Sequence, residues 1–220
     1  NGGTAVLEQF RAGGPWHRIG GMHATPVSRL LYLHGFRSSP RSTKARMMQA
    51  WLAERHPRVH WHCPQLPPSP REAAALIAAI TREWQPLDSA VVGSSLGGFY
   101  ATWLAEGLGC RAVLLNPAVH PARDLGRRVG EHTAWHDPAE RFVFEPGYVD
   151  ELRALARGPL ARPGHYLAII AKGDEVLDWR EMTARYPGAR QIVLEGGDHA
   201  LTGFEAHLPA IGRFLALRPD

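Results

Sequence analysis

The chain is short of cysteine and of lysine, and it has no long hydrophobic run. Its two cysteines, Cys63 and Cys110, are too few for a disulfide framework, so we expect two reduced, half-buried thiols. No apolar run reaches the roughly 18 residues that a membrane span requires. We expect no secretory leader, and we expect residues 1–21 to be a cloning remnant or a loose extension before Met22. These absences predict a cytoplasmic protein without a membrane span.

The positive charge of the chain is small and scattered. Lysine and arginine together number 25, but the formal net charge is only +4, and only Lys44 and Lys172 are lysines. The single adjacent pair of arginines is Arg127-Arg128, and no basic stripe alternates with aromatic residues. The composition, 45% hydrophobic and 21% charged, is that of an ordinary globular domain. The sequence therefore predicts no nucleic-acid partner.

From Arg29 onward, short apolar runs alternate with helix-length segments, which is the pattern of parallel βα units. The expected strands are 29–33, 59–63, 89–93, 111–115, 165–171 and 191–194. The expected helices between and after them are 42–55, 70–84, 96–106, 178–186 and 204–217. Ser69 and Glu72 form a capping box that begins the second of these helices. The pattern predicts one α/β domain over residues 22–220, with its strands in the order 2-1-3-4-5-6.

One connection is much longer than the others. About 49 residues, 116–164, separate the fourth strand from the fifth, where far fewer are normally needed. Segments 119–129 and 147–157 are expected to be helical. An insertion of this length in an α/β domain is typical of a lid over a binding site, so residues 117–163 are interpreted as a small helical cap.

The cap carries side chains that suit an acyl substrate. Trp135, Phe142 and Phe144 would provide apolar surface over an acyl pocket. Arg123 and Arg127, four residues apart, would meet an anionic group of the substrate. The alternative for both arginines is a solvated helix face.

The segment Gly93-Ser94-Ser95-Leu96-Gly97 matches G-x-S-x-G, the nucleophile elbow of serine hydrolases. It follows an apolar strand and begins a helix, as that turn requires. Ser95 is therefore the expected nucleophile, and the Leu96 N–H at the helix start would bind an oxyanion. Ser94 is the rival nucleophile, but it would put the flanking glycines out of register.

His34-Gly35-Phe36 directly follows the first expected strand. Hydrolases with this strand order have a second oxyanion donor in that loop, so the Phe36 N–H is expected to be that donor. His34 is a candidate substrate contact. A plain turn at the end of the strand is the alternative.

The acid and the base are expected to follow the nucleophile in chain order. Asp174 follows the fifth strand, and His199 follows the sixth in the loop Gly196-Gly197-Asp198-His199. His199 would take the proton of Ser95, and Asp174 would orient the imidazole. The rival acids are Asp178, Glu175 and Asp198.

Two histidine pairs have spacings that metal sites also use. His60 and His62 lie two residues apart on one strand, and His132 and His136 lie four apart. The sequence fixes no third ligand for either pair. We therefore expect neither a metal nor an organic cofactor.

The chain from Arg29 to Leu217 resembles the YqiA-type esterases, a bacterial branch of the α/β-hydrolases. The matching stretches are LYLHGFRSSP (31–40), WLAERHP (51–57), CPQLPPSP (63–70), VGSSLGGFYATWLAE (92–106), LNPAVHP (115–121), GDEVLDWR (173–180) and EGGDHALTGFEAHLPAI (195–211). The resemblance implies a cytoplasmic carboxylesterase that acts on short acyl esters and acyl-CoA thioesters. It also implies a triad of Ser95, Asp174 and His199.

The expected fold is thus a three-layer α/β-hydrolase, with a mostly parallel six-stranded sheet and a small helical cap. The expected reaction is hydrolysis of a small-molecule acyl ester or thioester through an acyl-enzyme. Because fold does not fix function, a lyase and a ligand-binding protein that use the same pocket stay open as alternatives.

Overall fold

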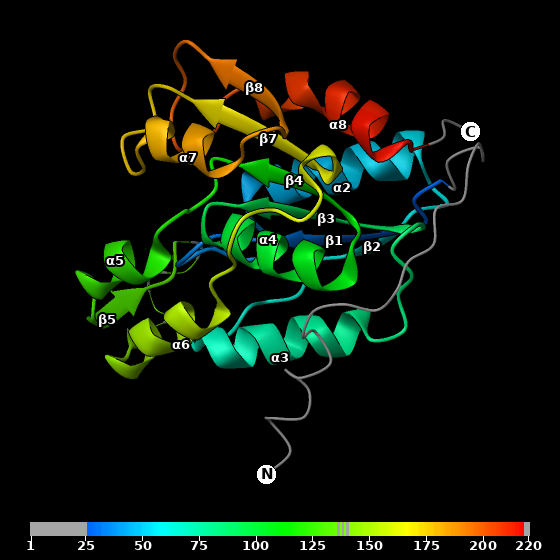
Figure 1. Ribbon diagram of the computed structural model, residues 1–220. Helices are drawn as coiled ribbons and strands as arrows, with labels where there is room; N and C mark the ends of the chain where they lie inside the picture. The colour runs from blue at the N-terminus through cyan, green and yellow to red at the C-terminus, as the bar shows by residue number, and fades with distance from the viewer. Residues whose placement is uncertain (1–25, 136, 138, 140, 218–220) are drawn as a thin grey trace.

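The computed structural model describes residues 26–135, 137, 139 and 141–217. Its centre is a sheet of six parallel strands in the order β2-β1-β3-β4-β7-β8 (Figure 1). The strands are β1 (Arg29–Leu33), β2 (His60–His62), β3 (Ser89–Ser94), β4 (Arg111–Leu115), β7 (Tyr166–Ala171) and β8 (Arg190–Leu194). The expected α/β class and strand order are confirmed.

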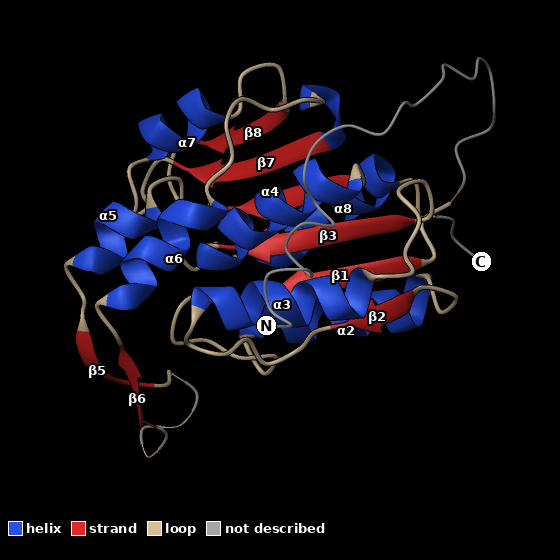
Figure 2. Ribbon diagram, turned by 60° about the horizontal axis from the view of Figure 1, so that its bottom comes forward, coloured by secondary structure: helices blue, strands red, loops and turns tan. Residues whose placement is uncertain are grey.

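Helices cover both faces of this sheet, which makes three layers (Figures 1 and 2). One face carries α3 (Pro70–Thr81), α4 (Leu96–Leu108) and α7 (Trp179–Arg185). The other carries α2 (Thr43–Arg55), the short η2 (Phe204–His207) and α8 (Leu208–Leu215). The Ser69 hydroxyl accepts a hydrogen bond from the Glu72 N–H at 3.2 Å, so the expected cap of α3 is formed.

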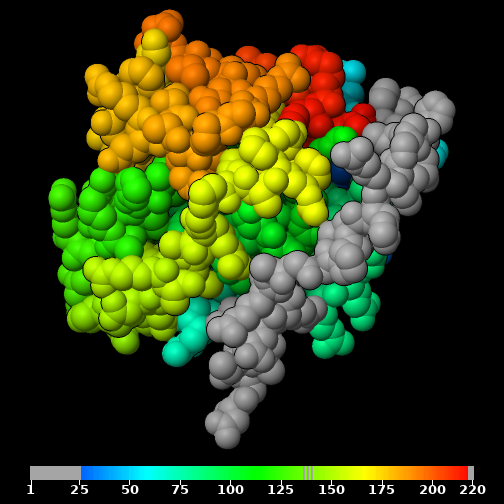
Figure 3. Space-filling view, viewed as in Figure 1, coloured from blue at the N-terminus to red at the C-terminus, as the bar shows by residue number. Residues whose placement is uncertain are grey.

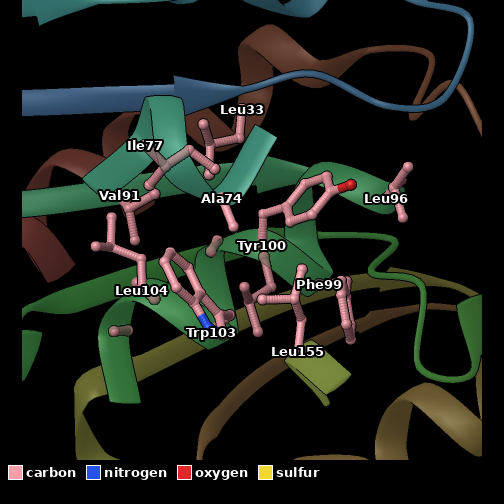
Figure 4. Packing of buried hydrophobic residues seen from close by; sticks show 14 of the residues in the cluster. Leu33, Ala74, Ile77, Val91, Leu96, Phe99, Tyr100, Trp103, Leu104 and Leu155 are labelled. Carbon is pink, nitrogen blue, oxygen red and sulfur yellow. The ribbon is translucent and has the colours of Figure 1, made fainter. Parts of the chain in front are cut away.

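The central strands are apolar throughout because both of their faces are buried. In β1, Leu31 and Leu33 belong to the core beneath α3 and α4, whereas Leu30 and Tyr32 belong to the core beneath α2 and α8. Successive side chains of a strand point to opposite faces, so one strand supplies both cores. Figure 4 shows the first core, in which side chains of β1, β3, α3 and α4 pack together.

The cap differs from the expected helical one. It contains α5 (Pro121–Gly126), the antiparallel strands β5 (Gly130–Thr133) and β6 (Arg141–Phe144), and α6 (Gly147–Leu155), and the short η1 (Pro163–His165) follows. The helix expected over 119–129 thus covers only six residues. In β6, Phe142 and Phe144 lie on one side and Val143 on the other. That alternation of aromatic and β-branched residues favours a strand.

Other expectations need smaller corrections. The helix expected over 204–217 is two pieces, η2 and α8, and α3 ends at Thr81. Both cysteines are free thiols, but Cys110 is fully buried and only Cys63 is half-buried. Residues 1–21 lie outside the described part of the chain. Within that part, no helix combines the length and the apolar character that crossing a membrane demands.

Candidate active site

Ser95 occupies the sharp turn between β3 and α4. Its backbone has φ 55° and ψ −120°, a conformation that is rare for residues other than glycine. The turn is held by its neighbours, because the Ser95 N–H donates to the Leu115 carbonyl at 3.0 Å and the Ser95 carbonyl accepts from the Ala118 N–H at 2.9 Å. The strained backbone therefore presents Ser95 at the carboxyl edge of the sheet.

The glycines on either side of Ser95 are required by close packing. A Cβ at Gly93 would overlap the Gly97 carbonyl, and a Cβ at Gly97 would overlap the Leu33 carbonyl. Gly35 lies against the nucleophile itself, since a Cβ there would be 3.1 Å from the Ser95 Cβ. Strand β1, helix α4 and the loop after β1 thus meet closely around the serine.

His199 connects Ser95 to Asp174. The His199 Nδ1 lies 2.8 Å from the Asp174 Oδ2, and the Nε2 lies 3.1 Å from the Ser95 Oγ. Because the carboxylate takes the Nδ1–H, the neutral imidazole has its lone pair on Nε2, toward the serine hydroxyl. The Asp174 side chain is fully buried, and its Oδ1 accepts from the backbone N–H groups of Val176 and Leu177, both at 2.8 Å. The Asp174 carboxylate is therefore held by backbone N–H groups independently of its contact with His199.

The rival groups have other contacts. Asp178 is the N-cap of α7 and accepts from the Arg180 N–H. Glu175 accepts from the backbone N–H of His199 at 3.0 Å, and Asp198 accepts from Thr202. Those hydrogen bonds from Thr202 hold the pKa of Asp198 below its usual value. Ser94 is buried within β3.

The backbone N–H groups of Phe36 and Leu96 are the expected oxyanion donors. Leu96 is the first residue of α4, where N–H groups have no partner within the helix. Among the described residues, the structure gives no acceptor to either N–H. Both belong to residues adjacent to the Gly35–Ser95 contact.

His34 supports the wall of the site. It is buried, and its Nε2 accepts from the Leu66 N–H at 3.0 Å, while Nδ1 lies 2.9 Å from the Gly35 carbonyl. With Nε2 as the acceptor, Nδ1 carries the proton and donates to Gly35. His34 thus joins the loop after β1 to the proline-rich loop at 64–68.

Two pockets lie beside the loop after β1 and the start of α4, and they share Phe36, Arg37 and Leu96. The larger, about 490 Å³, is lined by Ser95 and His199. The smaller, about 270 Å³, is lined by neither of these residues, and its lining includes the apolar side chains of Leu66, Tyr100 and Phe142.

The three cap aromatics have different environments. Trp135 lines the larger pocket and is 71% exposed, and the Arg37 guanidinium lies 4.1 Å from its ring centre. Phe142 lines the smaller pocket. Phe144 is buried with its ring 5.5 Å from that of Phe36, and it lines neither pocket. Phe144 therefore joins the cap to the loop after β1.

The two cap arginines also differ. Arg123 binds both carboxylate oxygens of Glu181 in α7, at 2.6 and 2.7 Å, and also contacts Asp124. This guanidinium holds the pKa of Glu181 below its usual value. Figure 3 shows the α5 surface (green) directly against that of α7 (yellow to orange). Arg127 is exposed and lines the larger pocket.

The histidine pairs form no metal centre in the described part of the chain. There, no three His, Cys, Asp or Glu side chains gather closely enough to hold an ion. His62 packs against Trp84 in an open hollow beside β2, and His132 packs against Phe36. His136 lies outside the described residues.

Two residues at the site were not anticipated from the sequence. Arg37, with φ 61°, donates from Nε to the Thr133 carbonyl at 2.7 Å and so ties the loop after β1 to β5 of the cap. Asn116 is a buried residue just after β4, and its side chain contacts the loop of His199. Its position gave a usable signal, because polar residues at the carboxyl ends of parallel strands gather at one edge of the sheet.

Comparisons with known proteins agree with this architecture. A UPF0227 protein of Shewanella sediminis (strain HAW-EB3) is 25% identical over 189 residues, which cover 84% of this chain and 98% of that protein. Among solved structures, one chain described under the metagenome-derived lipolytic enzymes LipS and LipT gives a TM-score of 0.62 at 17% identity, over 90% of this chain and 97% of that one. Alpha/beta hydrolase domain-containing protein 10 from mouse gives a TM-score of 0.59 at 14% identity, over 85% of this chain and 90% of that one.

These likenesses show the α/β-hydrolase fold, with a six-stranded parallel sheet between helices. The family model that matches is described as an uncharacterised protein family (UPF0227), and it covers residues 29–216. The chain therefore belongs to the UPF0227 family and has the α/β-hydrolase fold.

Proposed function

We propose that this protein is a serine carboxylesterase of the YqiA type. The observation that supports the proposal most is the continuous line of contacts from Asp174 through His199 to Ser95, at 2.8 and 3.1 Å. The fold is shared with lipolytic enzymes, and that likeness is consistent with ester chemistry. Both cysteines are free thiols, which suits a protein of the reducing cytoplasm.

The proposed reaction has two steps. The His199 Nε2 takes the proton of Ser95 as its Oγ attacks the ester carbonyl, and the N–H groups of Phe36 and Leu96 bind the tetrahedral oxyanion. The imidazolium, stabilised by Asp174, then protonates the leaving alcohol or thiol. A water molecule activated by His199 releases the acid and regenerates Ser95.

The leaving group and the acyl group of the substrate are assigned to different pockets. The general acid must reach the leaving-group atom, so the leaving group belongs in the larger pocket, which His199 lines. The acyl group then occupies the smaller pocket, beside the apolar side chains of Leu66, Tyr100 and Phe142. Burial there stabilises an acyl chain by about 0.8 kcal/mol per methylene group. The small volume favours short to medium acyl chains.

The larger pocket also suits an anionic leaving group. Arg127 lines it, and among the described residues it has no carboxylate partner, whereas Arg123 is engaged by Glu181. An acyl-CoA thioester carries phosphates on its leaving group and fits this description. Of Arg123 and Arg127, Arg127 is therefore the one that we assign to the substrate, and its neighbour Arg128 lines the same pocket.

The test is a profile of activity over p-nitrophenyl esters of increasing acyl length and over matching acyl-CoA thioesters. The control is Ser95→Ala, with a fluorophosphonate probe to report a reactive serine. We expect acid release by the wild type, labelling at Ser95, and neither in the variant.

The alternative functions give different outcomes. A ligand-binding protein would leave Ser95 unlabelled and release no acid. A lyase would be labelled but would not hydrolyse the esters. Either result would exclude the esterase.

A further inference from the structure

The buried side chain of Asn116 makes three hydrogen bonds to the backbones that carry the acid and the base. Its Oδ1 accepts from the Ala171 N–H at 2.8 Å, at the end of β7. Its Nδ2 donates to the carbonyl oxygens of Asp198 and His199, at 3.0 and 3.3 Å. Only this orientation of the amide matches one N–H and two carbonyl partners, so the assignment of oxygen and nitrogen is determined.

The backbone of Asn116 is held in place as firmly as its side chain. Its φ is 42°, in the left-handed region that asparagine tolerates better than most residues. Its N–H donates to the Ile169 carbonyl at 3.0 Å, and the preceding Leu115 carbonyl accepts from the Ser95 N–H. The amide is therefore fixed relative to the nucleophile elbow.

The loop of His199 is held both by its own hydrogen bonds, in which Asp198 accepts from Leu201 and Thr202, and by contacts from other elements. Residues 195–197 are exposed, and the His199 side chain is 23% exposed. Three side chains of other segments contact the loop. Glu175 accepts from the His199 N–H, and Lys44 Nζ donates to the Ala200 carbonyl at 2.7 Å. Asn116 Nδ2 donates to the carbonyl oxygens of Asp198 and His199. Of these three residues, only Asn116 also binds the strand that leads to Asp174.

We propose that Asn116 is a positioning residue, which uses one amide to set His199 in line with both Asp174 and Ser95. This inference rests on the proposed function. The amide touches neither the substrate nor the imidazole, so its effect reaches the reaction only through the placement of His199. A displacement of about 1 Å can lower a rate about 100-fold.

The test compares Asn116→Asp with Gln191→Glu. Asp at position 116 keeps the oxygen that accepts from Ala171 but cannot donate to the histidine loop. Gln191 is the matched control, because its Nε2 also donates to two backbone carbonyls, those of Thr183 and Tyr186 at 3.1 and 2.9 Å, away from the site. Both changes replace an amide with a carboxyl group and remove two donated hydrogen bonds.

We expect Asn116→Asp to lower kcat about 10- to 100-fold on a p-nitrophenyl ester with KM nearly unchanged, and to slow fluorophosphonate labelling in parallel. Gln191→Glu should keep kcat within about 3-fold, even if the two variants lose equal thermal stability. Wild-type kcat in Asn116→Asp, or equal losses in both variants, would overturn the proposal. Asn116→Gly, which accepts the positive φ and adds no charge, provides the same comparison if the Asp variant does not fold.

A second measurement separates this proposal from the proposed function. The Nδ1–H proton of His199, bound to Asp174, should give a far-downfield NMR signal that His199→Ala removes. We expect Asn116→Asp to weaken or shift that signal and Gln191→Glu to preserve it. An unchanged signal in Asn116→Asp would refute the positioning role, whether or not the wild type hydrolyses esters.

Discussion

At the scale of single residues, the candidate site depends on a few side chains with very different support. Ser95 is fixed by a strained turn and Asp174 by two backbone N–H groups. His199 instead occupies a loop that is held in part by side chains of other elements, Asn116 and Glu175. The three members of the proposed triad are therefore expected to respond differently to changes in their surroundings.

Ser95→Ala and His199→Ala should each lower kcat by about 10⁴-fold or more, and the double variant should be hardly worse than either single one. The reason is that a nucleophile and its base act as one unit, so removing the second adds little once the first is lost. Steady-state kinetics on one ester measures all three variants. Additive losses, or a Ser95→Ala enzyme with a tenth of wild-type activity, would contradict the assignment.

Asp174→Asn should lower kcat by about 10⁴-fold, whereas Asp178→Asn should change it only a few-fold. A neutral amide at 174 neither stabilises the imidazolium nor selects the required tautomer. Asn at 178 remains a good N-cap for α7, so the control variant keeps its structural role. A larger loss in the Asp178 variant would move the acid to that position.

At the scale of elements, the cap is joined to the hydrolase core by specific side chains. Arg37 ties the loop after β1 to β5, Phe144 packs on Phe36, and the pair of Arg123 with Glu181 joins α5 to α7. Arg127, Arg128 and Trp135 are among the cap residues that line the larger pocket and take no part in these three links. In the proposed function, the cap therefore has some side chains that attach it to the core and others that face the substrate.

Arg127→Ala should raise KM for an acyl-CoA several-fold and leave KM for an uncharged p-nitrophenyl ester unchanged. The lost guanidinium would no longer attract the phosphates, and added salt should reduce the difference between wild type and variant. Arg123→Ala is the control, since its charge is already paired with Glu181. Equal effects on KM for both substrate classes, or no effect on either, would show that Arg127 is a solvated surface residue without a role in substrate binding.

The pair of Arg123 with Glu181 should make a pH-dependent contribution to stability. The guanidinium lowers the pKa of Glu181 in the folded protein, so its stabilisation is present above the unfolded-state pKa and is lost as the pH falls through the folded-state pKa. Because both groups are partly exposed, the pair contributes less than about 1 kcal/mol. Thermal unfolding of wild type and Glu181→Gln should therefore differ slightly at pH 7 and converge in acid. A difference that grows toward low pH would refute this.

At the scale of the whole molecule, the sheet and the order of its strands could be read from the sequence because buried parallel strands are apolar runs with helices between them. Ser95, Asp174 and His199 could be selected because each follows a strand at the same edge. The hairpin of the cap and the contacts of Asn116 could not be predicted from the sequence. β5 has little apolar character of its own, and the partners of Asn116 are backbone groups about 55 and 82 residues further along the chain.

The native fold should keep both cysteines unreactive at pH 8. Burial raises the pKa of the Cys63 and Cys110 thiols to about 12, so almost no thiolate forms there. Treatment with Ellman's reagent should give little colour until denaturant is added, after which both thiols should react. Rapid reaction of either thiol in the native protein would show that the surrounding core is more open than described.

The distances along the chain between the site residues have a consequence for how the protein comes together. His199 meets a serine 104 residues earlier and an aspartate 25 residues earlier, and Asn116 reaches across 55 residues to Ala171. Contacts between residues so far apart in sequence form late in folding, because the chain must first lose the conformational entropy of a long loop. A nascent chain that ends before β8 lacks His199, the proposed base, even when its elbow is complete. Reactivity at Ser95 is therefore a property that only the fully synthesised and fully closed sheet can acquire.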